Sequence, residues 1–401
     1  MPAMQYRRFG RTELLMPVFS CGGMRYQQGW GQIEPEAVEP ENQANIEATI
    51  QHALELGINH IETARGYGSS EMQLGWVLPK LPREKLIVQT KVGPTEHPKE
   101  FIERFEKSYS LLQLDYIDLL AFHGINTPQS LEWVLKKGGC MEVVRRLQKE
   151  GRVRNIGFST HAPSDVITQV CATGEFDYIN IHYYYVNQFN WPAIEEATRQ
   201  DMGVFIISPT DKGGRLQAPS DKMRELCAPL SPMQFNDLWC LSKPQIHTLS
   251  IGAARPSDFD EHVNSLEFYY ELRGVLGPVE ARLESEISRV FGDDWGQYWN
   301  KSLPEHHQMP ESFNVREAFR LLTYGKSFDL VDWAKGRYNL MKGTDPWIPG
   351  AHAGVLDTPE KWAAVTQALS SHPLVAQIPA RLHEAHDLLA GEDAKRLSAG
   401  G

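Results

Sequence analysis

Eight short runs of apolar residues, rich in β-branched and aromatic side chains, alternate with longer amphipathic segments along the first two thirds of the sequence. Strands that are apolar on both sides are typical of a parallel sheet covered by helices on both faces. Eight such units in succession predict an α/β fold in which the sheet closes into a (β/α)8 TIM barrel. The competing arrangement, a doubly wound open sheet, is expected to carry GxGxxG after its first strand, and none is present there. The runs begin at Val18, Ile58, Leu86, Ile117, Val153, Tyr178, Val204 and Ile246.

The two ends of the chain lie outside this repeat. Residues 4–18 are predicted to form a small N-terminal hairpin with Gly10 in its turn, placed to close one end of the barrel. The last strand–helix unit ends near residue 272, so we predict a barrel over residues 1–272 and a helical C-terminal extension over residues 273–401. Five of the ten tryptophans lie in the extension, which favours packing against the barrel. Residues 392–401 are expected to be frayed.

Composition excludes several classes of protein. The chain has 401 residues and a formal net charge of −11, which argues against nucleic acid or an anionic membrane as a partner. It contains no apolar run of about 18 residues that could cross a bilayer, and its first residues lack the apolar core of a signal peptide, so a cytoplasmic location is expected. The five cysteines form no CxxC pair and predict buried, reduced thiols, with neither a zinc site nor a disulfide framework.

Ionisable residues follow three successive predicted strands. Glu62 and Tyr67 follow the strand that begins at Ile58, Lys91 ends the next strand, and His123 ends the one after it. The carboxyl ends of the strands carry the active site in barrels of this type, so these four side chains are predicted to form a reaction centre. Each of them alone has an ordinary structural explanation, such as a solvated lysine or a hydrogen-bonded histidine.

Together, these four residue types suit the delivery of a proton. Tyrosine is a weak acid with a free pKa of about 10, and a nearby ammonium group such as that of Lys91 favours the phenolate and lowers this pKa. A carboxylate beside Lys91 would keep the amine charged and fixed in place. A histidine can donate a hydrogen bond to a carbonyl oxygen or orient the substrate. The set therefore predicts reduction of a carbonyl group, in which hydride reaches carbon and a proton must reach oxygen.

Residues 1 to about 272 resemble the aldo-keto reductases. The segments that carry the resemblance are RRFGRTELLMP, IETARGYGSSEMQLG, QTKVG, AFHGIN, GRVRNIGFSTH, DYINIHYYY and IGAARPSDFDEH, in the order and spacing of that family. The resemblance implies NAD(P)H-dependent carbonyl reduction on a (β/α)8 barrel. It implies that Tyr67 is the general acid, that Lys91 lowers the pKa of Tyr67, and that His123 orients the substrate. Glu62 stands where the family usually has aspartate, and we expect this change to alter rate or substrate range while the chemistry is kept.

The resemblance also implies a set of residues around the nicotinamide. Tyr183 would stack on the nicotinamide ring. The residues expected to clamp the carboxamide are Ser159, Thr160 and Asn180, and those expected near the adjoining ribose are Gly23, Met24 and Arg25.

The same resemblance places the phosphates and the adenosine of the cofactor. The loop over the pyrophosphate would be formed by Ser208, Pro209, Thr210, Asp211, Lys212 and Gly213. Residues 252–262 would hold the adenosine end, through Gly252, Arg255, Asp258 and His262. Arg255 is the candidate ligand of the 2′-phosphate that distinguishes NADPH from NADH, so NADP(H) is the predicted cofactor. Asp258 and His262 depart from the residues usual in the family.

The extension resembles, more weakly, that of a microbial aldo-keto reductase branch that carries cysteine-rich iron–sulfur motifs. Because no cysteine follows Cys240, we expect a metal-free helical remnant here. Two other functions remain open. One is a regulatory or partner subunit that binds NADPH with little turnover. The other is a metal-dependent hydrolase that would recruit His123, His161 and His182, although no HxH pair follows the first strand.

Overall fold

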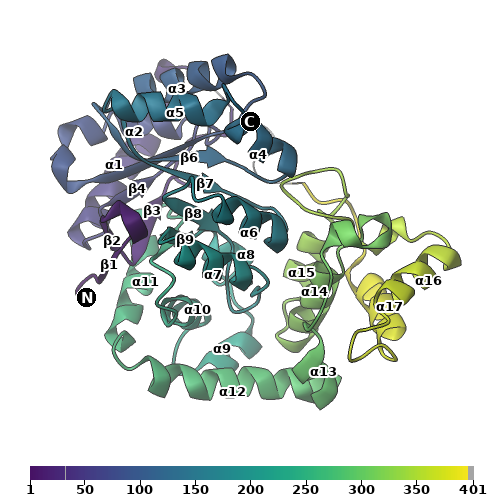
Figure 1. The fold of residues 1–401 in the computed structure, drawn as a ribbon. Coiled ribbons are helices and arrows are strands. Elements are labelled where there is room, and N and C mark those ends of the chain that lie inside the picture. Colours follow the sequence, from purple (N-terminus) through teal and green to yellow (C-terminus); the bar gives the residue numbers. More distant parts are fainter. Residues whose placement is uncertain (32, 396–401) are drawn as a thin grey trace.

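The computed structural model describes residues 1–31 and 33–395 as a closed barrel of eight parallel strands surrounded by helices (Figure 1). The strands follow one another around the barrel in chain order, and β10 pairs with both β3 and β9 to close it. All eight runs identified in the sequence form these strands, which confirms the predicted fold. Residues 396–401, part of the segment expected to be frayed, lie outside the described residues. The barrel strands are β3 (Phe19–Gly22), β4 (His60–Glu62), β5 (Ile87–Val92), β6 (Ile117–His123), β7 (Val153–Ser159), β8 (Tyr178–Ile181), β9 (Gly203–Ile206) and β10 (Thr248–Ile251).

The helices that follow the strands cover the outside of the barrel with an apolar face. In α3, the buried residues Phe101, Phe105, Ser108 and Leu112 recur with helical spacing on the side that faces the sheet. α4 begins with a capping box in which the side chains and backbone amides of Thr127 and Ser130 satisfy one another. The helices of this part are α1 (Pro40–Glu55), α2 (Ser70–Gly75), α3 (Pro98–Leu112), α4 (Pro128–Leu135), α5 (Cys140–Lys149), α6 (Ser164–Ala172), α7 (Trp191–Arg199), α8 (Pro209–Lys212), α9 (Asp221–Cys227), α10 (Pro232–Leu241) and α11 (Asp260–Asn264).

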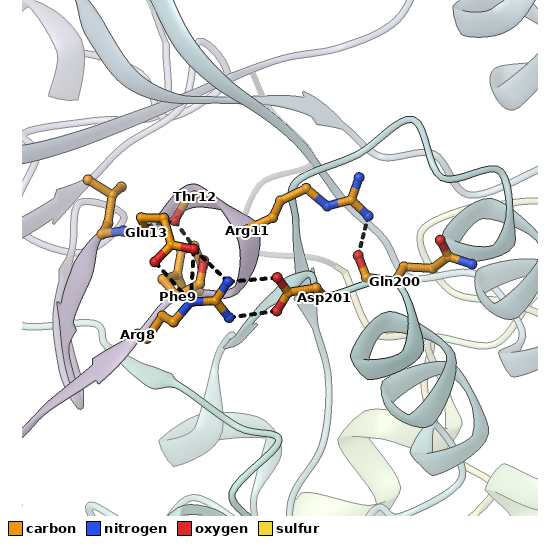
Figure 2. Close-up of polar contacts among 8 residues, drawn as sticks. Arg8, Phe9, Arg11, Thr12, Glu13, Gln200 and Asp201 are labelled. Atoms are coloured by element: carbon orange, nitrogen blue, oxygen red, sulfur yellow. Dashed lines mark hydrogen bonds and ion pairs between the residues drawn. The ribbon is translucent and has the colours of Figure 1, made fainter.

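An N-terminal hairpin, β1 (Tyr6–Arg8) and β2 (Leu15–Pro17), closes the end of the barrel where the strands begin, as the sequence predicted. The side chain of Phe9 is 0% exposed and packs on Tyr178 with ring centroids 5.8 Å apart. Arg8 donates two hydrogen bonds of 2.7 Å to Asp201 and also pairs with Glu13 (Figure 2). The hairpin is therefore fixed to the barrel by one buried ring and a network of surface charges.

The extension packs as a group of helices beside the barrel, joined to it by the long helix α12 (Figure 1). α12 contacts α9 and α10, and the fully buried Trp295 packs edge-on against Phe319 of α14 with ring centroids 5.1 Å apart. Arg320 of α14 donates a 3.1 Å hydrogen bond to the backbone oxygen of Val186, which ties the extension to the loop after β8. The helices are α12 (Leu272–Phe291), α13 (Asp293–Tyr298), α14 (Val315–Ser327), α15 (Val331–Tyr338), α16 (Pro359–Ala368) and α17 (Ile378–Leu389).

Two further predictions concern the cysteines and membrane-spanning helices. All five cysteines are buried and unpaired, as expected of reduced core thiols. Within residues 1–31 and 33–395, no helix is both long enough and apolar enough to cross a membrane.

Candidate active site

The four ionisable residues predicted to form a reaction centre lie together at the carboxyl ends of β4, β5 and β6. Lys91 Nζ lies 3.1 Å from Tyr67 Oη, forms an ion pair with the carboxylate of Glu62, and donates a 2.9 Å hydrogen bond to the backbone oxygen of Thr63. The rings of Tyr67 and His123 meet edge to face, with centroids 5.8 Å apart. Residues from three strands therefore hold one phenol between an amine and an imidazole.

Burial dominates the electrostatics of this centre. It raises the pKa of the Tyr67 phenol well above its usual value and lowers the pKa of Lys91. The lowering of the Tyr67 pKa by Lys91 stays a prediction, because burial alone accounts for the direction of the shift. The Tyr67 hydroxyl therefore keeps its proton at neutral pH. The Glu62 carboxylate is the charge that opposes the effect of burial on Lys91.

The longer side chain of Glu62 fits because a glycine faces it. A Cβ atom on Gly22, at the end of the neighbouring strand β3, would lie 3.3 Å from Oε2 of Glu62 and 2.5 Å from Oγ of Ser250. Gly22 therefore leaves room for the Glu62 carboxylate, which pairs with Lys91. The predicted charge pairing of Glu62 with Lys91 is confirmed.

A cleft of about 1890 Å³ opens above these residues and extends across the ends of the strands. Glu62, Tyr67, Lys91 and His123 form part of its wall. The wall also includes most of the residues predicted to bind the cofactor, namely Met24, Arg25, Ser159, Ser208, Pro209, Thr210, Lys212, Gly252, Arg255, Asp258 and His262.

Comparison with known proteins decides the family. The model of the Aldo/keto reductase family matches residues 19–270 of the chain. The chain belongs to this family. Its (β/α)8 barrel also resembles an aldo-keto reductase from Bacillus halodurans in its holo form, with a TM-score of 0.56 and 22% identity over 69% of this chain and 96% of that one.

Curated relatives match shorter parts of the chain. An NADH-specific methylglyoxal reductase from Escherichia coli is 31% identical over 187 residues, or 41% of this chain and 56% of that protein. An L-galactose dehydrogenase from Arabidopsis thaliana is 33% identical over 180 residues, or 42% of this chain and 52% of that protein. The chain thus spans about half the length of these two relatives.

Five predicted cofactor residues of this aldo-keto reductase do not line the cleft. The clearest correction is Tyr183, whose ring is 3% exposed and stacks on Trp239 with centroids 5.3 Å apart and 19° between the planes. The prediction that Tyr183 stacks on the nicotinamide is contradicted, because the chain turns after β8 and directs this ring toward α7 and α10. The other four are Gly23, Thr160, Asn180 and Gly213.

The structure gives these residues packing roles in the loops and in the barrel interior instead. Thr160 Oγ1 donates a 2.8 Å hydrogen bond to the backbone oxygen of Ile125, which joins the loops after β6 and β7. A Cβ atom would lie 2.7 Å from the Glu62 backbone oxygen at Gly23, and 2.0 Å from the Pro209 backbone oxygen at Gly213. Both glycines are therefore required by the close approach of neighbouring backbone.

Asp258 and His262, which differ from the residues usual in the family at the adenosine end, both have partners within the protein. Asp258 accepts hydrogen bonds from the backbone amide of Ala254 (2.8 Å) and from Nε of Arg255 (3.1 Å), so its carboxylate holds the loop in place. His262 is buried with Nδ1 2.5 Å from Asp237. Burial is the largest single influence and opposes protonation of His262, but the charge and hydrogen bond of Asp237, together with the charges of Glu261 and Asp258, raise its pKa overall. His262 thus forms a buried ion pair beneath the cleft.

The extension supplies part of the cleft that the sequence analysis missed. We call Trp333, Arg337, Trp347 and Ile348 the roof, because all four line the cleft and come from the extension. The Trp347 ring lies 5.1 Å from that of His123 and 5.0 Å from that of His161, measured between centroids. A Cβ atom on Gly124 would come within 2.6 Å of this indole. Only the concentration of tryptophans in the extension hinted at this contact.

The cleft fits a nicotinamide dinucleotide. Ser159, one of the residues predicted to clamp the carboxamide, lines this cleft. Arg25, Lys212 and Arg255 place positive charge along the rest of the cleft, as phosphates require.

The three histidines considered for a metal-dependent hydrolase do not form a ligand set. The Trp347 indole lies against both His123 and His161, and His182 contacts the Tyr184 hydroxyl and Lys212. Among residues 1–31 and 33–395, no group of three or more His, Cys, Asp or Glu side chains is arranged to hold a metal ion.

Proposed function

We propose that this aldo-keto reductase reduces the carbonyl groups of aldehydes and ketones to alcohols with NADPH, and that Tyr67 donates the proton. The observation that carries the proposal is the 3.1 Å contact between Tyr67 Oη and Lys91 Nζ inside a cleft that also contains Glu62 and His123. A carbonyl oxygen placed between Tyr67 and His123 would meet an O–H donor and an imidazole edge together.

Each residue of the set has a separate role. NADPH, when bound, supplies a hydride for the carbonyl carbon. Tyr67 gives its hydroxyl proton to the carbonyl oxygen as negative charge develops there. Lys91 stabilises the phenolate left behind, and Glu62 keeps the lysine charged in its buried position. His123 orients the carbonyl oxygen toward the phenol.

The preference for NADPH rests on Arg255. Its side chain is 73% exposed at the predicted adenosine end of the cleft, where a guanidinium could bind a phosphate in a bidentate manner. One of its donors already pairs with Asp258 at 3.1 Å, which fixes the direction of the side chain. Comparing kcat/KM for NADPH and NADH with one aldehyde tests this part of the proposal.

We also propose that the helices and loops of the extension up to residue 395 complete the substrate chamber. Trp333, Arg337 and Trp347 of this segment form part of the cleft wall, which supports a role in substrate choice beyond packing.

Replacing Tyr67 by phenylalanine tests the proton donor. General acids contribute roughly 10²–10⁴-fold to rates, so kcat for an aldehyde is expected to fall by at least about 10²-fold in Tyr67→Phe while NADPH still binds. Tyr109→Phe is the matched control, because that hydroxyl donates a hydrogen bond to the Asp115 backbone oxygen at the surface and does not line the cleft. An undiminished rate in Tyr67→Phe would refute the assignment.

The alternative of a regulatory subunit gives a different result. It predicts that the wild-type protein binds NADPH tightly and yet reduces no member of a panel of aldehydes and ketones.

A further inference from the structure

Arg337 of α15 lies where two cavities meet. One is the cleft that contains the reaction centre, and the other is a smaller cavity of about 110 Å³ between the barrel and the extension. The wall shared by the two cavities contains His161, Lys212, Arg337, Trp347 and Ile348. The guanidinium of Arg337 therefore borders space that is continuous with the cleft.

This guanidinium has no hydrogen-bond or ion-pair partner among residues 1–31 and 33–395, and its Nε is buried without an acceptor. The carboxylates that face it already have arginines of their own. Glu317 binds Arg320 through two hydrogen bonds of 2.8 and 2.6 Å, and Asp211 lies 3.8 Å from Arg25. Burial lowers the pKa of Arg337, which is the mark of a charge whose surroundings do not compensate it.

The rest of the small cavity adds no unpaired acid. Its other carboxylate, Glu305, pairs with Arg316 and accepts a 3.0 Å hydrogen bond from the Ser164 backbone amide. Arg337 is thus a cation whose neighbouring carboxylates already pair with other arginines, which favours an anionic ligand at this guanidinium.

A short series of ring contacts joins this place to the reaction centre. The centroids of His123 and Trp347 are 5.1 Å apart, those of Trp347 and His161 are 5.0 Å apart, and those of His161 and His182 are 4.4 Å apart. Lys212 Nζ then lies 2.9 Å from Nε2 of His182. Because His123 faces Tyr67, an anion at the shared wall would lie on the substrate side of the cleft.

We propose that Arg337 binds a carboxylate carried by the substrate, so that the preferred substrates are oxo acids with the carboxylate a few bonds away from the carbonyl carbon. This inference rests on the proposed carbonyl reductase function. A phosphate of the cofactor would offer similar oxygens, and Lys212, which is predicted for the pyrophosphate loop, lines both cavities, whereas the residues predicted for the adenosine end (Gly252, Arg255, Asp258 and His262) do not line the small one. Arg337 comes from the extension, outside the predicted pyrophosphate loop, and the ring contacts of the shared wall lead to His123. We therefore assign the anion to the substrate.

Two matched aldehydes test the proposal by turnover. The wild-type protein is expected to reduce 4-oxobutanoate with kcat/KM roughly 10–100-fold above that for butanal, since a hydrogen-bonded charge is worth about that factor. In Arg337→Met this ratio is expected to fall toward one, because the carboxylate of 4-oxobutanoate loses its partner and butanal has no carboxylate to lose one. Arg337→Lys, which keeps the charge but loses the planar fork, is expected to give an intermediate ratio.

Arg146→Met is the control variant, because Arg146 is 61% exposed on α5 and does not line either cavity. It should leave both rates unchanged. Equal ratios in the wild type and in Arg337→Met, with butanal still reduced, would overturn the proposal.

Calorimetric titration with succinate, which cannot be reduced, gives a readout that is independent of turnover. Succinate is expected to bind the wild-type protein in the presence of NADP⁺ and to bind Arg337→Met at least about tenfold more weakly. If Arg337→Met weakens NADP⁺ binding and leaves succinate binding unchanged, the anion belongs to the cofactor and the proposal fails. If succinate binding depends on Arg337 but no aldehyde is reduced, the anion site stands and the proposed function fails.

Discussion

Replacing Glu62 by glutamine should destabilise the protein strongly, because it leaves the ammonium of Lys91 buried without its counter-charge. Both side chains are buried, with 1% exposure for Lys91 and 4% for Glu62. Removing one partner of a buried ion pair typically costs about 3–5 kcal/mol. The loss of stability cannot exceed the cost of releasing the Lys91 proton, because the lysine can become neutral instead. At pH 7 this cost is about 5 kcal/mol for a lysine whose unfolded pKa is about 10.4. We therefore expect Glu62→Gln to lower the free energy of unfolding by about 3–5 kcal/mol, measured by urea denaturation.

The pH dependence of the same variant identifies the cause. Burial already lowers the pKa of Lys91, and loss of Glu62 lowers it further. Between the folded and unfolded pKa values the unfolded chain binds more protons than the folded one, so stability rises with pH, by up to about 1.4 kcal/mol per pH unit. Between neutral pH and the pKa of a free lysine, the free energy of unfolding of the variant should therefore rise more steeply with pH than that of the wild type. Over the same range, the difference in stability between the two proteins should shrink.

The control for this experiment is Glu106→Gln. Glu106 pairs with Arg152 at the surface, where its side chain is 49% exposed, so its loss should cost no more than about 1 kcal/mol. If Glu62→Gln is as stable as Glu106→Gln, or its stability follows pH as the wild type does, then Lys91 does not depend on Glu62 and our account of the pair is wrong.

Three more substitutions separate the hairpin, the roof and the cofactor site. Phe9→Ala removes a fully buried ring and should lower the free energy of unfolding by about 3–5 kcal/mol in urea with kcat unchanged, because Phe9 lies at the opposite end of the barrel from Tyr67; a loss below 1 kcal/mol would contradict its role. Gly124→Ala brings a methyl group within 2.6 Å of the Trp347 ring, so the indole must move, and KM for the carbonyl substrate should rise while KM for NADPH stays constant; unchanged constants would show that the indole does not border the substrate. Arg255→Ala should raise KM for NADPH by roughly tenfold or more and leave that for NADH unchanged, whereas equal effects on both would exclude a contact with the 2′-phosphate.

The barrel and its reaction centre were predictable from the sequence because both follow from local pattern. A strand buried on both faces must be apolar throughout, so each of the eight runs is visible without any alignment. The closed topology then brings the carboxyl ends of successive strands together, which places Glu62, Lys91 and His123 side by side.

The parts that were missed depend on tertiary packing. Three tyrosines follow β8, and the turn after that strand, which sequence periodicity does not encode, directs Tyr183 toward Trp239. The net shift of the Tyr67 pKa depends on how much water the fold removes, which the neighbours in sequence do not reveal. Trp347 reaches His123 from more than two hundred residues away in the chain, so only the docking of the extension places it there.

The indoles around the cleft should make ligand binding visible without a label. Trp30 meets the Tyr67 ring at 6.5 Å between centroids, and Trp347 touches His123, so two emitters border the space where hydride transfer would occur. A reduced nicotinamide absorbs light in the range where tryptophan emits, and energy transfer over such short separations quenches the emission. Loss of the quench as the coenzyme is oxidised would therefore report each turnover from within the protein itself.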